Sequence, residues 1–296
     1  IVTGFRERFS NTNDIYRYYC GKYIGGFYDY FAIAFLYMSY IVMVAGAGAT
    51  LAQYYGLPTF VGCIGMAFVS AFTVTFGLGR IVDVIGTIGP AIVLFAIGIG
   101  LAAIFKNPEG IARGAQMIEA AEVEMTKVGT NWFTSGMSYV GFSMLWLAAF
   151  LAAMGQKANS AKEAVIGTTL GAAGFVVGII IMMLGLLAVA MTDIPSLILA
   201  ERIYPPIATV FSLIIMGGIY TTSVPLLWSV SARFSQEKTR KFYLLTVGLA
   251  VSGCVVGLLL PFQRIVNIIY GINGYVGIML ILFMIVTTVR NMKKAA

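Results

Sequence analysis

The feature of this sequence that most constrains its fold is a series of long apolar segments. An α-helix needs about 20 mostly apolar residues to cross the hydrocarbon core of a membrane. Eight such segments follow one another along the chain, at residues 29–53, 57–78, 81–105, 131–154, 164–191, 205–232, 242–261 and 265–289. Because lipid offers the backbone no hydrogen-bond partners, a spanning segment of this kind forms a helix. The sequence therefore predicts an all-α membrane protein with about eight transmembrane helices in a single domain, residues 1–296.

The composition excludes several other classes of protein. Hydrophobic residues make up 59% of the chain and charged residues only 10%, whereas a soluble domain carries roughly 25% charged residues. The net charge of +7 comes from short Lys and Arg clusters between apolar segments, which is typical of membrane proteins rather than of nucleic-acid binders. The chain has no His and no Walker, HExxH or Cys/His metal motif, so we expect no enzyme activity and no resident cofactor or metal. The expected partners are the lipid bilayer and a small molecule.

The distribution of positive charge predicts the orientation in the cell membrane. If residues 1–28 form a cytoplasmic segment, fourteen Lys and Arg residues lie on the cytoplasmic side and five on the other, as the positive-inside rule requires. Both termini of the chain are then cytoplasmic. The two longest connections, 106–130 and 192–204, then lie outside. The first is expected to hold a short surface helix with Glu119, Glu122 and Glu124.

An internal repeat relates the two ends of the chain. Residues 80–88 and 264–272 are identical at five of nine positions, at an offset of 184 residues. This offset pairs the first three segments with the last three, as repeat units 29–105 and 205–289 with the helices of 131–191 between them. Five helices separate the starts of the two units, so the units face opposite ways, which is a transporter architecture. The alternative is a chance match, since membrane helices draw on few residue types.

Several short motifs resemble the YkvI-like family of putative membrane transporters. They are Ala45-Gly46-Ala47-Gly48-Ala49, Gly-Leu-Gly-Arg-Ile-Val-Asp at 77–83, Asn131-Trp132 before Ser-Gly-Met-Ser-Tyr at 135–139, and Tyr220-Thr221-Thr222. That family belongs to the amino acid–polyamine–organocation superfamily, so the resemblance implies a LeuT-type fold with an inverted repeat of five plus five helices. The fourth and fifth segments have no counterparts before the first repeat unit. We therefore expect two further helices upstream of Ile1, and without them no saturable substrate binding.

The segment 131–154 holds the first candidate substrate site. Ser135, Gly136, Ser138 and Tyr139 lie within a stretch of small and polar residues that ends at Gly141. Glycines permit unwinding, and the freed N–H groups and hydroxyls then bind a carboxylate. The resemblance implies the same, because this segment corresponds to the family's second broken helix. The alternative is that these small residues pack against a neighbouring helix.

Two tyrosines of the first segment extend the predicted substrate site. Tyr37 and Tyr40 precede the Ala/Gly run, and Ser39 lies opposite Ser223 in the repeat. A tyrosine hydroxyl there is placed to reach a substrate carboxylate. The alternative is an ordinary aromatic anchor at the membrane interface.

A cluster of hydroxyls in the segment 205–232 is a candidate cation site. Thr221, Thr222 and Ser223 follow a glycine pair and precede Pro225. Hydroxyl oxygens suit a small hard cation such as Na⁺, and the resemblance implies a sodium site on the equivalent helix of LeuT-type proteins. Without the resemblance, the same cluster indicates a packing seam in which each hydroxyl bonds a carbonyl of its own helix.

Together these observations predict a secondary transporter of a small solute. The substrate expected is an amino acid or related zwitterion, moved by alternating access. Coupling to Na⁺ is favoured over H⁺, because no charged residue falls near the centre of any segment and proton relays need one. The alternative is a receptor or scaffold in the membrane that binds a small molecule with the same fold and transports nothing.

Overall fold

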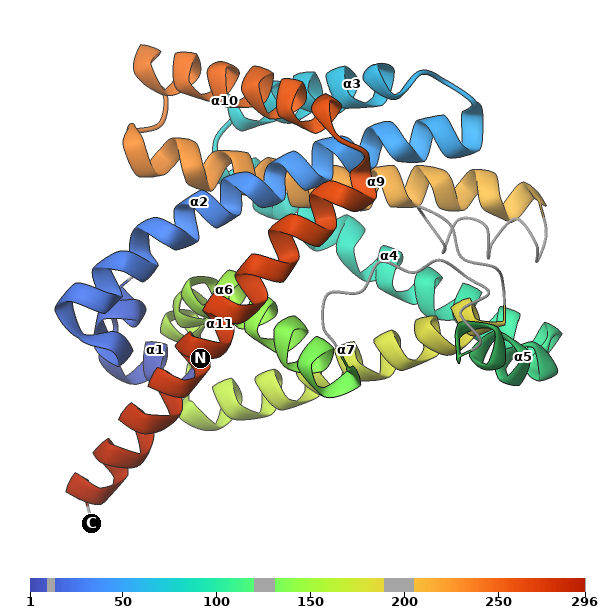
Figure 1. Cartoon of the computed structure of the whole chain (residues 1–296). Helices are drawn as coiled ribbons and strands as arrows, with labels where there is room; N and C mark the ends of the chain where they lie inside the picture. Colours follow the sequence, from blue (N-terminus) through green and yellow to red (C-terminus); the bar gives the residue numbers. More distant parts are fainter. Residues whose placement is uncertain (10–13, 120–130, 189–204, 296) are drawn as a thin grey trace. The chain divides into compact units, whose positions relative to one another are not determined.

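The computed structural model describes residues 1–9, 14–119, 131–188 and 205–295, and all of their regular structure is helical (Figure 1). The helices are α1 Val2–Glu7, α2 Asp14–Tyr55, α3 Thr59–Val74, α4 Leu78–Lys106, α5 Pro108–Glu119, α6 Trp132–Lys157, α7 Ala161–Leu187, α9 Pro205–Phe234, α10 Arg240–Leu259 and α11 Phe262–Ala295. Each of the eight predicted apolar segments overlaps one of these helices, although the helix of the second segment, α3, is short. The all-α fold class is therefore confirmed for this part of the chain.

Fewer than eight of these helices are long and apolar enough to span a membrane by themselves. Within the described residues five helices qualify, namely α2, α7, α10 and most of α9 and α11. A sixth span results if Ala91–Lys106 and Pro108–Glu119, which meet at 93°, count as one. Helix α3 has only 16 residues, short of the length that the hydrocarbon core requires. The count supports a multi-pass membrane protein, and the figure of eight spans stays a prediction.

Two of the predicted connections lie partly or wholly outside the described residues. The expected surface helix is present as α5, which ends at Glu119. Glu122, Glu124 and the connection 192–204 lie in the parts of the chain that the structure does not describe.

The N-terminal segment is largely helical, because α1 spans Val2–Glu7 and α2 begins at Asp14, before the predicted apolar segment at residue 29. The backbone turns at Gly21, whose φ of 74° only glycine adopts readily. After the turn, Gly25 packs against the backbone of Arg17, and the rings of Tyr16 and Tyr28 stack. The segment before the turn thus lies along the first part of the long helix.

The chain divides into two compact units, which are described separately. Unit 1 comprises residues 1–36, 127–173 and 266–296, and unit 2 comprises 37–126 and 174–265. In unit 1 two buried tyrosines connect three helices, because the Tyr16 hydroxyl donates to Leu145 O of α6 at 3.1 Å. The Tyr28 hydroxyl likewise donates to Val276 O of α11 at 2.9 Å.

Unit 2 is built around the Ala/Gly run of α2. A Cβ at Gly48 would lie 2.6 Å from Cys63 Sγ, and one at Gly62 would lie 2.5 Å from Ala47 O. Neither glycine tolerates a side chain, so α2 and α3 approach with their backbones close together. On another face of α2, Gly46 lies against the ring of Phe262. Small residues here set the distance between helices.

The glycine stripe of α7 differs from this pattern. Residues Gly167, Gly171, Gly174 and Gly178 follow one another at helical spacing on one face, which is typical of close packing against another membrane helix. Among the described residues nothing lies within 4 Å of a Cβ built at Gly167, Gly171 or Gly174, and only Gly178 approaches a neighbour, Ile97 of α4. The packing interpretation holds at Gly178 alone.

Candidate functional site

The predicted repeat units exchange contacts within unit 2. The Tyr37 hydroxyl of α2 lies 2.6 Å from Ser252 Oγ of α10. Correspondingly, the Tyr220 hydroxyl of α9 lies 2.9 Å from Thr73 Oγ1 of α3. The 184-residue offset of the predicted repeat carries Tyr37 to the position directly after Tyr220, so the two tyrosines nearly correspond. The first helix of each predicted repeat unit thus bonds the second helix of the other.

The ends of the helices in unit 2 fall into two groups. At one end, Gly77, which precedes α4, lies against the carboxylate of Glu237, which precedes α10. At the other end, the hydroxyl of Tyr54 lies 2.6 Å from Thr209 Oγ1 near the start of α9. Helix α4 runs away from the first group to Asn107, which donates to Ala188 O at 3.3 Å. Helices α4 and α9 therefore run in opposite directions, and residues 106–110 and 235–239 lie at opposite ends of this helix pair.

The candidate cation residues bond carbonyls of their own helix. The hydroxyls of Thr221 and Thr222 both donate to Gly218 O, at 3.0 and 2.8 Å, and Ser223 donates to Ile219 O at 2.7 Å. This is the packing alternative predicted for the cluster. The lone pairs of each hydroxyl oxygen still permit coordination.

The sequence analysis missed one further oxygen near the candidate cation residues, namely the backbone carbonyl oxygen of Thr221. Pro225 lies inside the continuous helix α9, although proline in a helix interior commonly kinks or breaks the helix. Since proline has no N–H, it cannot donate to the carbonyl four residues earlier, which belongs to Thr221. The four-residue spacing between Thr221 and Pro225 in the sequence indicates that the Thr221 carbonyl lacks its usual helical donor.

The two tyrosines of α2 make structural hydrogen bonds. Tyr40 is fully buried, its hydroxyl lies 3.1 Å from Ser70 Oγ, and its ring lies against Gly253. Tyr37, besides its contact with Ser252, donates to Leu249 O at 3.2 Å. Both side chains therefore join α2 to its neighbours in unit 2.

Between these tyrosines, Ser39 is exceptional. It is fully buried, and its Oγ has no hydrogen-bond partner among the residues that the structure describes. Leaving a buried polar group unpaired costs about 1–3 kcal/mol. The hydroxyl therefore favours an additional donor or acceptor, such as a water molecule or a solute.

The candidate substrate residues of α6 lie on a continuous helix. Asn131 begins it with a capping box, in which Thr134 N donates to Asn131 Oδ1 at 2.9 Å. The unwinding expected before Gly141 is not found in this described helix, so that expectation is corrected. The reason lies in α11, because Gly141 meets the backbone of Gly277 directly.

The four predicted residues of α6 have different surroundings within unit 1. Ser138 is 2% exposed and packs against Gly274 of α11. Tyr139 is 46% exposed, Ser135 is half-buried and Gly136 is exposed. No described atom lies within 4 Å of a Cβ built at Gly136. Ser138 thus fits the packing alternative, and the four do not converge on one point.

Beside this contact, Asn273 of α11 holds a second unpaired oxygen. Its side chain is fully buried, and its Nδ2 donates to Ile269 O of its own helix. Its Oδ1 has no partner within the described part of the chain.

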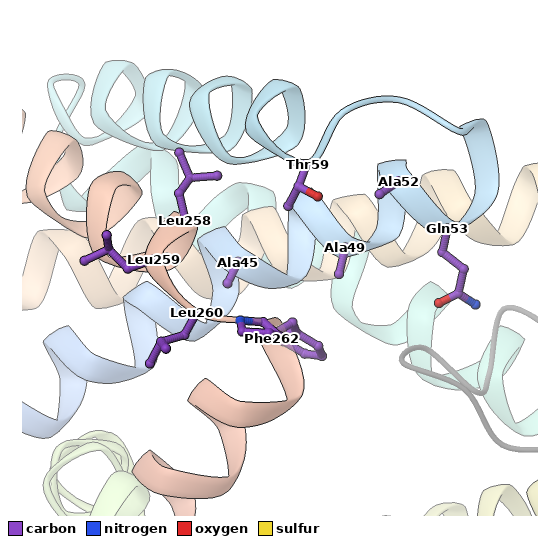
Figure 2. A pocket seen from close by; sticks show the side chains of 11 residues that line it. Ala45, Ala49, Ala52, Gln53, Thr59, Leu258, Leu259, Leu260 and Phe262 are labelled. Atoms are coloured by element: carbon purple, nitrogen blue, oxygen red, sulfur yellow. The ribbon is translucent and has the colours of Figure 1, made fainter.

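A cavity of about 820 Å³ opens in unit 2 beside the Ala/Gly run (Figure 2). Ala45, Ala49 and Gln53 of α2 line it, together with Thr59 at the start of α3 and residues 257–262. Figure 2 shows Phe262 beneath α2 and the three leucines that precede it on the other side of Ala45. The predicted site residues do not line this cavity, although the Ala/Gly run was recognised as a motif.

The predicted site residues are divided between the units. Ser135, Gly136, Ser138 and Tyr139 belong to unit 1, while Tyr37, Tyr40, Thr221, Thr222 and Ser223 belong to unit 2. Among the described residues no three His, Cys, Asp or Glu side chains gather as metal ligands would. No family model, curated protein or solved structure matches the chain.

Proposed function

We propose that this protein is a secondary transporter of a small solute, with an amino acid or related zwitterion as substrate, working by alternating access. The observation that carries the proposal is the exchange of contacts between the repeat units. Tyr37 bonds Ser252 and Tyr220 bonds Thr73, so each first helix holds the second helix of the other unit. Inverted repeats of membrane helices are the architecture of many secondary transporters.

Buried polar groups in apolar helices give further support. Ser39 and Asn273 each hold an oxygen without a described partner. Such groups are costly in a membrane and generally mark a pathway or binding site. A packed structural helix gains nothing from them, whereas a protein that binds a polar solute uses them.

Coupling to Na⁺ is the second part of the proposal. The hydroxyls of Thr221, Thr222 and Ser223 lie on consecutive residues of α9, and Pro225 withdraws the helical donor from the carbonyl of Thr221. Several oxygens therefore lie within one turn. This is the ligand type that a hard cation takes.

The alternative is a receptor or scaffold that binds a small molecule without transporting it. The hydrogen bonds of Thr221, Thr222 and Ser223 within α9 favour this reading, because they need no ion. Transport and binding are separated by uptake measurements.

The experiment is amino-acid uptake into vesicles that contain the complete protein, with an inward gradient of Na⁺ or of K⁺. We expect uptake with Na⁺ and little with K⁺. Thr222→Val should weaken the Na⁺ dependence and cost only about 0.6 kcal/mol of stability. Thr169→Val is the matched control, because that hydroxyl also bonds its own helix, at 2.9 Å from Val165 O. Saturable binding without uptake under either gradient would favour the receptor, and an unchanged Na⁺ response in Thr222→Val would refute the cation site.

A further inference from the structure

The cavity of about 820 Å³ beside the Ala/Gly run of α2 is large enough to enclose a small solute (Figure 2). Binding sites for small molecules have volumes of about 300–1,000 Å³. The space exists because three small residues of α2 line it, Ala45, Ala49 and Ala52. The ring of Phe262 forms another part of the wall. It is held against Gly46, where a Cβ would lie 3.2 Å from the ring.

The lining of this cavity carries no charged side chain within the described part of the chain. Besides the alanines and Phe262 it consists of Gly257, three leucines, Pro261 and two polar side chains, Gln53 and Thr59. A charged solute side chain would be buried there without a partner of opposite charge, which is costly. The cavity therefore suits a large apolar group and selects against a charged one.

One wall of the cavity is the carboxyl end of α10. The helix ends at Leu259, and residues 257–260 line the cavity. The last carbonyls of a helix have no intrahelical donors and carry a partial negative charge. At Gly257 the donor is removed outright, because the residue four places later is Pro261, which has no N–H. These carbonyls are suited to an ammonium group.

Another wall is the amino end of α3. Thr59 begins that helix, and Pro58 before it gives no side-chain cap. Val61 N donates to Pro58 O at 2.9 Å, whereas the N–H groups of Thr59 and Phe60 precede any intrahelical acceptor. Such N–H groups carry a partial positive charge and attract a carboxylate. The cavity thus has groups of opposite partial charge in its wall.

These two helix ends approach α2 within one helical turn of each other. A Cβ built at Gly257 would lie 3.6 Å from the Cβ of Ala45. One built at Gly48 would lie 2.7 Å from the carbonyl oxygen of Thr59. Positions 45 and 48 are three residues apart, which is about 4.5 Å along the helix axis. The charges of the two ends therefore complement those of one small zwitterion.

We propose that this cavity binds a neutral amino acid with a large apolar side chain, such as leucine or phenylalanine. The inference rests on the proposed transport function and names the class of amino acid that is transported. The apolar side chain lies against the alanines and Phe262, the ammonium group lies at the end of α10, and the carboxylate lies at the start of α3. The connections 56–58 and 260–261 both fall outside in the predicted orientation, so the solute enters from that side.

The test measures binding of radiolabelled phenylalanine to the complete protein in detergent, and amino-acid uptake into vesicles in parallel. The competitors are leucine, glycine, lysine, leucinamide, which lacks the carboxylate, and N-acetylleucine, which lacks the ammonium group. Ala49→Leu narrows the cavity, and Ala172→Leu on an exposed face of α7 is its matched control. Thr59→Glu places an acid at the start of α3, where the helix dipole favours it, so the fold is kept while the ligand's carboxylate is repelled. Thr59→Gln is the uncharged control.

We expect saturable phenylalanine binding that leucine displaces, with glycine, lysine and the two leucine analogues at least about tenfold weaker as competitors. Ala49→Leu and Thr59→Glu should weaken binding by a similar factor, and each more than its control. Equal displacement by leucine, glycine and lysine, or equal binding by Ala49→Leu and Ala172→Leu, would overturn the proposal.

Parallel uptake separates this inference from the transport function. Absence of phenylalanine binding would overturn the cavity as the site, and uptake of a different amino acid in that case would leave the transporter proposal standing. Conversely, phenylalanine binding that is sensitive to Ala49→Leu, without uptake of any amino acid, would support the site and refute transport.

Discussion

The two ends of unit 2 are related by the predicted repeat, yet they are closed differently. At one end Glu237 joins the α9–α10 connection to Trp228 and to Gly77 before α4. At the other end, the connection 260–261 lines the cavity of about 820 Å³, and so do Gln53 and Thr59, which flank the connection 56–58. The α9–α10 connection contains Glu237, which faces the indole N–H of Trp228, whereas the connection Gly56-Leu57-Pro58 carries no charge. In the two halves that the predicted repeat pairs, side chains therefore decide which end of unit 2 is closed.

The largest loss of stability is expected where α2 packs against α3, at the end of unit 2 that holds the cavity. A Cβ at Gly48 would lie 2.6 Å from Cys63 Sγ and 2.7 Å from the Thr59 carbonyl oxygen, so Gly48→Ala overpacks a backbone contact. We expect a loss of up to about 3 kcal/mol in thermal unfolding in detergent. Gly65→Ala in α3 is the control, since no described atom lies within 4 Å of its Cβ position. Equal stability of the two variants would show that the cavity does not depend on this close approach.

A smaller loss of stability is expected at the other end of unit 2, where Glu237 contacts Trp228. Glu237→Ala leaves the Trp228 N–H without its charged acceptor, and a hydrogen bond to a charged group is worth about 1.5–3 kcal/mol. Thermal unfolding should report a loss near the lower value, because both side chains are only part-buried. Trp228→Phe should cost a similar amount and the double variant little more. Fully additive losses would mean that the two residues do not act as a pair.

The smallest effect on stability belongs to the cavity itself. Ala49→Leu fills space at its wall, so stability should change by less than about 1.5 kcal/mol. If the cavity belongs to the solute pathway, uptake into vesicles falls while stability is kept. Ala172→Leu, on an exposed face of α7, should leave uptake unchanged. Equal uptake by both variants would remove the cavity from the pathway.

The helices were predictable because the length of each apolar segment is a local property. The start of α2 was missed because its early turns are rich in Tyr and Gly rather than aliphatic residues. Of those tyrosines, Tyr16 is buried, and its burial depends on contacts such as its hydrogen bond to Leu145. Contacts so distant in sequence leave no local signal.

The candidate sites were predictable only as pairs of alternatives. Glycines such as Gly141 permit both unwinding and close packing, and the choice depends on Gly277, far along the chain. The hydroxyls of α9 bond their own carbonyls because those carbonyls lie three or four residues away in any helix. The contact of Glu237 with Trp228 and Gly77 depends on tertiary structure, and no local pattern announced it.

The inverted repeat is the central claim, and the sidedness of two connections tests it most directly. Single cysteines at Ala112→Cys in α5 and Gln236→Cys before α10 occupy exposed positions, in a background where Cys20, Cys63 and Cys254 are replaced by Ser. Labelling of sealed, oriented membrane vesicles with an impermeant maleimide should place position 112 outside and position 236 in the cytoplasm. Labelling of both positions from the same side would contradict the inverted repeat and the transport mechanism that rests on it.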